Sequence, residues 1–279
     1  MKIAANTFFT FRKLGEEKGL ACIREAGFDG IDYTFYDPQI EEFLLHGDYI
    51  AAAQESRKRL EASGLFCRQA HAPLHYNCND TPELSNPHYL SIVRSMEYAA
   101  IMGIPIIVVH GVVPPEGEDL IDYNERFYQT LEPYCRRFGI RIGVENLLGS
   151  EVFTTPEELL AMMDRLDPEW FGICLDIGHT RLGSWNEADF IRAVGGSRIE
   201  ITHIHDNDGV GDLHQVPYMG NTDWNAAARA FAETGYRGEL SLEVLSFLEA
   251  FPGDLQLPAL RLCAAALKKL ADLIDPPSA

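Results

Sequence analysis

Side chains of the kinds that bind metal ions recur along this 279-residue chain just after short apolar runs. Six of these runs have the composition of a β-strand and end on a histidine or a carboxylate: His71, His110, Glu145, Asp176, His205 and Glu243. Three further candidates lie beyond the runs that end at Asp176 and His205, namely His179, Asp212 and His214. Mixed imidazole and carboxylate ligands favour Zn, Mn, Co or Fe, whereas an all-oxygen set would favour Mg or Ca. The pattern therefore predicts a site for a borderline divalent metal ion.

A single histidine or acid at the end of a strand is more often a hydrogen-bonded structural residue than a ligand. Six together are a different case, because buried charges are costly unless they are paired or bound to a metal. For His71, His110 and His214, a structural or substrate-binding role is an equal alternative to metal binding. His203 shares a strand face with His205, and only the histidine at the strand end need bind.

The elements that would position these side chains alternate along the chain. Strand-like segments are each followed by a helical pattern, which indicates βαβ units around a parallel sheet. The predicted strands span 2–8, 30–35, 66–71, 105–110, 141–146, 171–176, 199–205 and 240–244. The predicted helices span 15–26, 48–63, 87–102, 120–137, 156–166, 187–194, 223–234 and 257–274. Six of the strands follow a glycine that can end the preceding helix. These glycines are Gly27, Gly64, Gly103, Gly139, Gly196 and Gly238.

Eight repeats of strand and helix predict a (β/α)8 TIM barrel, in which the C-terminal strand ends meet at one catalytic mouth. The structural alternative is an open doubly wound sheet. Its dinucleotide-binding form is weakened because no Gly-x-Gly-x-x-Gly fingerprint follows the first strand. No linker or shift in composition divides the chain, so we expect one domain over residues 1–279.

The charge of the chain bears on its partners. With 42 acidic and 23 basic residues, the formal net charge is −19, and such a field repels polyanions and acidic membranes. We therefore expect no nucleic-acid partner and no membrane partner. The first fifteen residues lack a long apolar segment, and six scattered cysteines form no Cys-x-x-Cys pair, so we expect a cytoplasmic protein with reduced thiols. A homo-oligomer remains open.

At several motifs the chain resembles the xylose-isomerase-like TIM-barrel superfamily, over nearly its whole length. This superfamily includes sugar isomerases, ketose 3-epimerases, inosose-processing enzymes and nucleases of the endonuclease IV type. The resemblance is carried by five segments: Ala26 to Asp32, Val144-Glu145-Asn146, Leu175 to His179, His203 to Asp208, and Asp212-Leu213-His214 running on to Asp223-Trp224. These motifs are specific to the superfamily but do not choose a member.

For the isomerase and epimerase members, the resemblance implies a divalent ion, with Mn²⁺ or Zn²⁺ preferred over Mg²⁺ or Co²⁺. Its ligands would be Glu145, Asp176, His205 and Glu243, and the two glutamates would also form the acid/base pair. A metal that binds a carbonyl and its neighbouring hydroxyl acidifies the C–H between them, which either carboxylate can deprotonate. The implied function is isomerisation or epimerisation of a small sugar-like hydroxy-carbonyl substrate through an enediolate intermediate.

Three alternatives stay open. An endonuclease IV-like zinc phosphodiesterase would use all nine candidates as a trinuclear site, with His71, His110, His179, Asp212 and His214 as the additional ligands. An inosose-type dehydratase or lyase would use the same enolate chemistry. A sugar-binding protein without turnover would leave the two glutamates without a task.

Charge at the mouth favours the sugar enzyme. The loops expected there (72–86, 111–119, 147–155, 206–222 and 245–256) contain no lysine or arginine, and the nearby cations are Arg12, Lys13 and Arg181. A DNA-binding mouth needs several basic phosphate contacts, and the same shortage favours an unphosphorylated sugar. Aromatic residues that could stack on a sugar, or belong to the core, are Phe8, Phe9, Tyr33, Phe35, Trp185 and Trp224.

Two positions depart from the patterns of the relatives. Ketose 3-epimerases tend to carry an arginine six residues after the ligand histidine, where this chain has Gly211. Tyr218 stands where many relatives have the first glycine of a Gly-x-Gly before the Asp-Trp pair. The first departure argues against a standard 3-epimerase.

Overall fold

Eight parallel strands form one sheet in a computed structural model that describes residues 1–149 and 152–276. Part of the predicted 147–155 loop and the last residues of the predicted 1–279 domain lie outside the described residues. The strands are β1 (Ile3–Asn6), β2 (Gly30–Thr34), β3 (Phe66–His71), β4 (Ile106–Val109), β5 (Arg141–Glu145), β6 (Phe171–Asp176), β7 (Ile199–His203) and β8 (Leu240–Leu242). All eight predicted strands are confirmed, with ends that differ from the predicted ends by at most two residues.

The two ends of the sheet meet and form a barrel. The strand order is β7-β6-β5-β4-β3-β2-β1-β8, and an isolated parallel bridge joins Ile204 to Leu242. The Ile204 amide donates to the Ser241 carbonyl at 2.8 Å, and the Glu243 amide donates to the Ile204 carbonyl at 3.1 Å. The (β/α)8 TIM barrel is therefore confirmed, and the open doubly wound alternative is wrong.

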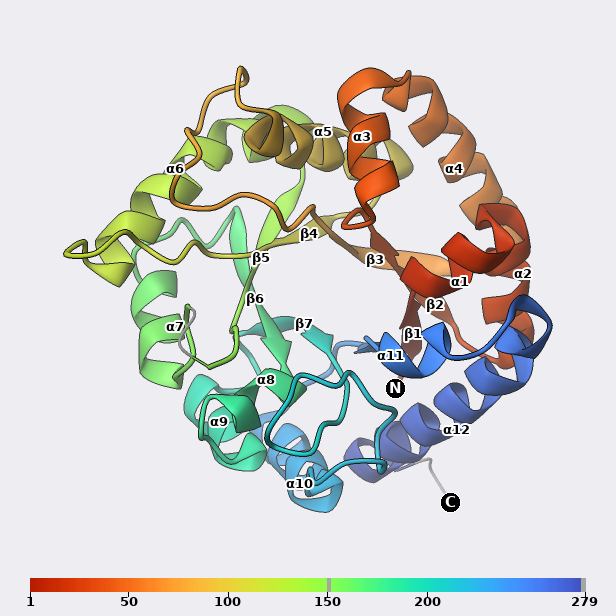
Figure 1. The fold of residues 1–279 in the computed structure, drawn as a ribbon. Helices are drawn as coiled ribbons and strands as arrows, with labels where there is room; N and C mark the ends of the chain where they lie inside the picture. The colour runs from red at the N-terminus through yellow and green to blue at the C-terminus, as the bar shows by residue number, and fades with distance from the viewer. Residues whose placement is uncertain (150–151, 277–279) are drawn as a thin grey trace.

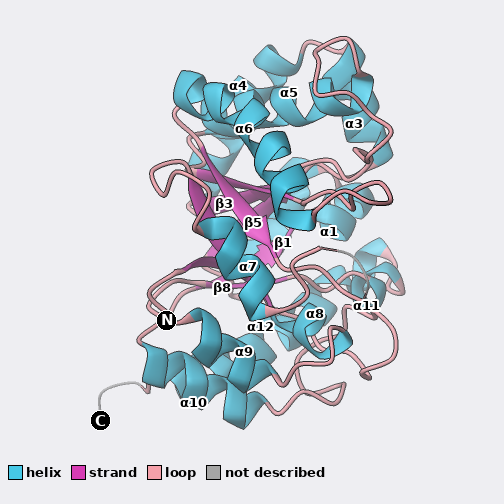
Figure 2. Cartoon of the chain, turned by 90° about the vertical axis from the view of Figure 1, so that its left-hand side faces the viewer, coloured by secondary structure: helices cyan, strands magenta, loops and turns pink. Residues whose placement is uncertain are grey.

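Helices surround this ring of strands (Figure 1). The predicted helices are confirmed as α2 (Glu16–Ala26), α4 (Tyr49–Ser63), α5 (Pro87–Met102), α6 (Leu120–Phe138), α7 (Pro156–Met163), α9 (Glu187–Val194), α10 (Trp224–Thr234) and α12 (Gln256–Ile274). Additional short elements are α1 (Phe8–Leu14), α3 (Pro38–His46), α8 (Ile177–Leu182), α11 (Ser246–Glu249) and the 3-10 helix η1 (Gly253–Leu255). In Figure 2, α1, α8 and α11 lie together on the right of the strands, opposite the N-terminus.

The helix ends follow simple capping chemistry. At α7, the Thr155 side chain accepts from the Glu158 amide and Pro156 occupies the first turn, as the sequence predicts. Left-handed glycines end four helices as expected: Gly27, Gly64, Gly103 and Gly139. Gly195 and Gly235 end α9 and α10, so the assignment of those two ends to Gly196 and Gly238 is wrong.

The core packs on both sides of the strand ring. Side chains alternate between the two faces of each strand, and most strand residues are buried. A large cluster joins strands to helices, and a separate small cluster contains Ile106, Val108, Cys174 and Ile201. All six cysteines are free thiols. Within the described residues, we find no helix both long and apolar enough to cross a membrane.

Candidate metal centre

The predicted ligands gather at the C-terminal ends of the strands. His71, Glu145 and Asp176 are the last residues of β3, β5 and β6, while His110 and Glu243 each follow a strand by one residue. The last residue of β7 is His203, with His205 two residues beyond it. Of the three candidates placed in loops, His179 lies instead within α8, whereas Asp212 and His214 lie in the segment between β7 and α10.

A pocket of about 340 Å³ opens over these residues. It is lined by Tyr36, His71, Leu74, His110, Glu145, Leu147, Leu148, His179, Asp212, His214, Glu243 and Leu245. This volume suits a small ligand. Among the described lining residues there is no lysine or arginine, so the pocket offers acids and imidazoles to whatever enters it.

Three acids and one histidine form a central cluster, consisting of Glu145, Asp176, His203 and Glu243. One potential ligand atom from each lies within 4.8 Å of the others, and each residue is at most 4% exposed. His203 Nδ1 lies 2.8 Å from Glu145 Oε1, 3.5 Å from Glu243 Oε2 and 3.9 Å from Asp176 Oδ2. Sequence reasoning had passed over His203 in favour of His205.

His203 is enclosed by acids on both sides of its ring. Its Nε2 atom lies 3.2 Å from Asp32 Oδ2, and Asp32 is also fully buried. Burial alone would lower the pKa of His203, but the surrounding groups, Glu243 and Glu145 among them, raise it well above the usual value. Conversely, burial would raise the pKa of Glu145, while His203 and His110 hold it well below the usual value.

The second group, the outer cluster, consists of His179, His205, Asp212 and His214, also within 4.8 Å. Asp212 Oδ2 lies 2.9 Å from His214 Nε2 and 3.7 Å from His179 Nε2. The rings of His205 and His214 stack with centroids 4.0 Å apart. His205 Nε2 also lies 3.0 Å from Asp176 Oδ1, so Asp176 connects the outer cluster to the central one.

Backbone carbonyls orient three of the histidines. The Nδ1 atoms of His71, His179 and His214 donate at 2.9 Å to the carbonyls of Ala72, Asn146 and Glu243, respectively. Because a carbonyl can only accept, a neutral ring in this position keeps its Nε2 lone pair for the site. This is the orientation that histidine ligands take in metal proteins.

When no cation is bound, nearby carboxylates favour the protonated form of two of these rings, those of His179 and His214. Burial would lower the pKa of His179, but Asp176 and Asp212 raise it to about 10. Burial likewise opposes the shift at His214, where Asp212 and Glu243 raise the pKa to about 9. The acids of both clusters thus draw positive charge into the mouth.

His71 and His110 form a third contact group with Glu145. The two Nε2 atoms lie 3.2 Å apart, and His110 Nε2 lies 3.0 Å from Glu145 Oε2. His71 Nε2 lies 3.5 Å from the same oxygen. The structure therefore brings all nine sequence-predicted candidates to one mouth, with Glu145 and Asp176 shared between neighbouring groups.

Comparison with known proteins agrees with this architecture. The family model for the xylose isomerase-like TIM barrel matches residues 20–271. The chain belongs to this family. One relative of this xylose isomerase-like barrel is the uncharacterised protein y4fM of Sinorhizobium fredii, which is 28% identical over 269 residues, covering 82% of this chain and 81% of the relative.

Two solved structures have similar folds. The D-allulose 3-epimerase from Methylomonas sp. in complex with D-allulose has a TM-score of 0.72 at 18% identity, covering 98% of this chain and 96% of that one. The IolI protein with a bound zinc atom has a TM-score of 0.69 at 18% identity, covering 98% of each chain. At these sequence identities, the structural similarity establishes only the fold of this xylose isomerase-like barrel and not its function.

Sequence reasoning missed several residues that support the barrel's site. Tyr36 donates to Glu243 Oε1 at 3.3 Å and accepts from Asn6 Nδ2 at 3.0 Å. Asn146 accepts from the Asp176 amide and donates to the Asp176 carbonyl, both at 2.9 Å. Tyr36 lies just past a predicted strand and was therefore accessible to the same strand-end rule. The contacts of Asn146 depend on the neighbouring strand, which the sequence does not display.

A buried aspartate secures the loop that carries Asp212 and His214. Asp206 accepts from Trp224 Nε1 at 2.9 Å, the Tyr218 amide at 3.0 Å and the Thr222 amide at 3.2 Å. In this loop, His214 and Tyr218 have left-handed backbones, with φ of 44° and 78°. Tyr218 therefore occupies a conformation that glycine adopts at lower cost, and nothing in the structure explains the tyrosine.

Most of the aromatic candidates for sugar stacking belong to the core. Phe9, Tyr33, Phe35 and Trp224 are at most 8% exposed. Phe8 is partly buried and lies with its ring centroid 5.0 Å from that of Tyr36, which itself lines the pocket. Trp185 is also partly buried.

Proposed function

We propose that this protein is a metal-dependent isomerase or epimerase of a small, unphosphorylated sugar or related hydroxy-carbonyl compound. The strongest support comes from the central cluster. Glu145 ends β5 and Glu243 follows β8, and the two side chains lie together in a group that could hold a metal ion. Such a pair of carboxylates can carry out proton transfer at a carbon next to a carbonyl. The epimerase relative whose structure contains D-allulose gives independent support for the substrate class.

The donor set fits a divalent cation. Three nearly buried carboxylates repel one another unless positive charge lies between them, and the histidines that surround them supply nitrogen ligands for a borderline metal. His205 Nδ1 is buried without a hydrogen-bond partner among the described residues. The similar IolI structure contains zinc, which supports a metal at this mouth.

We assign Glu145, Asp176, His205 and Glu243 as the ligands. His203 lies with the three acids in the central cluster, whereas His205 belongs to the outer cluster. Both ring nitrogens of His203 face acids, Asp32 and Glu145, whereas only the Nε2 atom of His205 contacts an acid among the described residues. His205 contacts both oxygens of Asp176, at 3.0 and 3.1 Å, through one nitrogen. We therefore assign His203 as a positioning residue beneath the ligands.

The chain's own groups account for the proton movements. A bound cation would polarise the substrate carbonyl and stabilise negative charge on its oxygens. Glu145, held as a carboxylate by the neighbouring histidines, would remove the proton from the carbon next to the carbonyl, giving an enediolate of the substrate. Glu243, which accepts a hydrogen bond from Tyr36, would enter this step protonated and deliver its proton to the other carbon or the opposite face. One turnover would then leave Glu145 protonated and Glu243 ionised, and proton exchange with solvent would restore both.

The zinc nuclease is the serious rival, because all nine candidate ligands share the mouth. Its weakness is the state of the three nearby cations. Arg181 donates to Glu187 at 2.6 Å, Lys13 donates to backbone carbonyls including that of Leu248 at 3.1 Å, and Arg12 lies 4.0 Å from Asp37. Arg181 and Lys13 are therefore engaged within the chain, and Arg12 is the one loosely held cation of the three, which falls short of the several phosphate contacts that DNA binding needs. His71, His110, His179, Asp212 and His214 thus remain for a second ion or for substrate hydroxyls.

The direct test incubates metal-loaded protein with a panel of neutral ketoses, aldoses and inososes in deuterated water. We expect one compound to exchange a C–H proton for deuterium and to yield a product of unchanged composition. Loss of water from the product would instead identify the dehydratase. Nicking of abasic duplex DNA, without sugar turnover, would establish the nuclease and contradict the proposal.

A further inference from the structure

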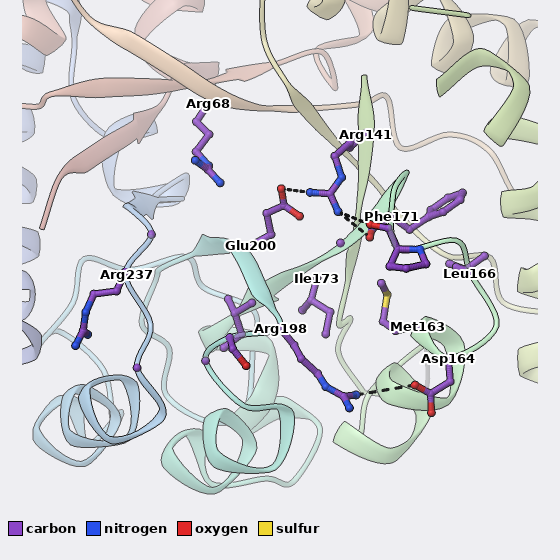
Figure 3. A pocket seen from close by; sticks show the side chains of 17 residues that line it. Arg68, Arg141, Met163, Asp164, Leu166, Phe171, Ile173, Arg198, Glu200 and Arg237 are labelled. Carbon is purple, nitrogen blue, oxygen red and sulfur yellow. Dashed lines mark hydrogen bonds and ion pairs between the residues drawn. The ribbon is translucent and has the colours of Figure 1, made fainter. Parts of the chain in front are cut away.

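A second, larger pocket lies at the opposite end of the barrel from the candidate metal centre. Its volume is about 790 Å³, compared with about 340 Å³ at the mouth. It is lined by the N-terminal starts of β5, β6 and β7, and by the segments that follow α7, α9 and α10. Figure 3 shows this pocket, with Arg141 paired with Glu200 and Arg198 reaching toward Asp164.

The charge of this pocket opposes that of the whole chain. Four arginines line it (Arg68, Arg141, Arg198 and Arg237), against two acidic residues, Asp164 and Glu200. The chain as a whole carries −19. A locally positive cavity in an acidic protein attracts anions, and arginine is the side chain best suited to bind phosphate and carboxylate.

One of the arginines serves as framework. Arg141 forms an ion pair with Glu200 and donates to the carbonyls of Pro168, Glu169 and Phe171 at 3.0 to 3.1 Å. This pairing neutralises Glu200 and leaves Arg141 little capacity for a ligand.

The other three arginines are held loosely. Arg198 lies 4.0 Å from Asp164, Arg68 Nε lies 3.5 Å from Glu239, and Arg237 donates to the Tyr236 carbonyl at 2.9 Å. Each guanidinium has five N–H donors, so these contacts leave donors for a ligand.

The floor of the pocket is apolar. Leu166, Phe171, Ile173 and Ile199 line it and are at most 6% exposed, and the half-buried Met163 lies at its side. Small-molecule sites combine such apolar walls with a few fixed polar groups. A bare inorganic anion would use the arginines but not this floor.

We propose that this pocket binds an organic oxyanion, in which a phosphate or carboxylate group contacts Arg68 or Arg198 and an apolar body packs against Met163 and Leu166. This site is separate from the proposed sugar site, and its occupant differs from the proposed substrate in both charge and apolarity. The shared chemistry is a compact oxyanion on an apolar group.

Calorimetric titration of the metal-loaded protein with phenyl phosphate, phenylacetate and inorganic phosphate tests this site. We expect saturable one-to-one binding of phenyl phosphate, phenylacetate or both, tighter than that of inorganic phosphate. The R68Q/R198Q double variant should weaken binding about tenfold or more, since charge-assisted hydrogen bonds are lost. The M163Q variant should weaken binding of the phenyl compounds but not of inorganic phosphate.

Arg57→Gln is the matched control, because Arg57 is exposed on α4 and pairs with Glu61 far from the pocket lining. The affinity of the Arg57→Gln variant for the phenyl compounds should stay within about twofold of that of the parent protein, a change smaller than the effect of one hydrogen bond. Binding only to phenyl phosphate would identify phosphate esters, and binding only to phenylacetate would identify carboxylates. No saturable binding, or equal binding by the double variant, would overturn the proposal.

Discussion

Glu145 is the residue on which the site depends most. Its two carboxylate oxygens contact different histidines, with Oε1 2.8 Å from His203 and Oε2 3.0 Å from His110. The same side chain is a proposed metal ligand and one member of the proposed acid/base pair, together with Glu243.

We expect Glu145→Gln and Glu243→Gln each to lower turnover by about 10²- to 10⁴-fold, the usual contribution of a general acid or base. Turnover and solvent deuterium exchange should be compared at saturating metal, so that weaker metal binding does not account for the loss. Glu17→Gln, an exposed change on α2, is the control. Near-normal turnover in either active-site variant would remove that glutamate from the mechanism.

His203, which ends β7, and His205, two residues beyond it, have different proposed roles: His205 binds the ion and His203 positions the ligands. We expect His205→Gln to lose the ion, while His203→Gln keeps it with reduced affinity, because Asp176 contacts His205 directly and His203 is paired with Asp32 and Glu145. Metal titration of both variants measures this. A His203 variant that loses the ion while the His205 variant retains it would exchange the two assignments.

At the scale of elements, the loop between β7 and α10 brings Asp212 and His214 to the mouth. We expect Asp206→Ala to lower the free energy of unfolding by about 3 kcal/mol, because the buried indole N–H of Trp224 and the partly buried amides of Tyr218 and Thr222 would lose a carboxylate acceptor. Urea unfolding measures the change. Asp208→Ala, in the same loop but exposed, should have a much smaller effect; equal losses would show that Asp206 is not the anchor.

The strained residue in that loop gives an opposite expectation. Tyr218 has φ of 78° and a side chain that is 42% exposed. Tyr218→Gly should raise stability by up to about 1 kcal/mol, because left-handed backbone is costly for residues with a Cβ atom. Tyr218→Phe keeps the strain and should change stability little in thermal unfolding. If the glycine variant is less stable than the phenylalanine variant, packing of the ring outweighs the strain.

The elements α1, α3, α8 and α11 were not predicted. Shortness explains α8 and α11, whereas α3 has nine residues, a capping Asp37 and Pro38 in its first turn, and these start signals were overlooked. The α8 segment Ile177–Leu182 is only six residues long, and its start is capped by Asp176, a residue also assigned as a ligand. Periodicity needs a longer window than this to indicate a helix. The helices of eleven or more residues have such windows, and these helices were predicted closely.

At the scale of the whole molecule, barrel topology converts sequence spacing into proximity. Residues about thirty positions apart, such as His110, Glu145 and Asp176, meet because parallel strands end at the same mouth. The rule predicts which side chains share a site, but not their pairwise contacts. The position of His203 depends on register: β7 shifts against β6 between Ile173 and Cys174, and Asp176 pairs with His203.

The pocket at the other end of the barrel was not predicted for a related reason. Its arginines come from a strand interior, a strand start and two connections, at positions 68, 141, 198 and 237. Sequence reasoning looked only at C-terminal strand ends, where barrel chemistry is expected. Only the folded structure brings those positions together.

The measurement that tests the central claim most directly is the metal content per chain, before and after chelation, with turnover and melting temperature followed in parallel. We expect at least one tightly held divalent ion per chain, lost turnover and a lower melting temperature on chelation, and recovery of both with Mn²⁺ or Zn²⁺. Glu145→Gln should bind the ion more weakly than Glu17→Gln. A protein that binds no divalent ion, or that keeps full turnover after complete removal, would contradict the account.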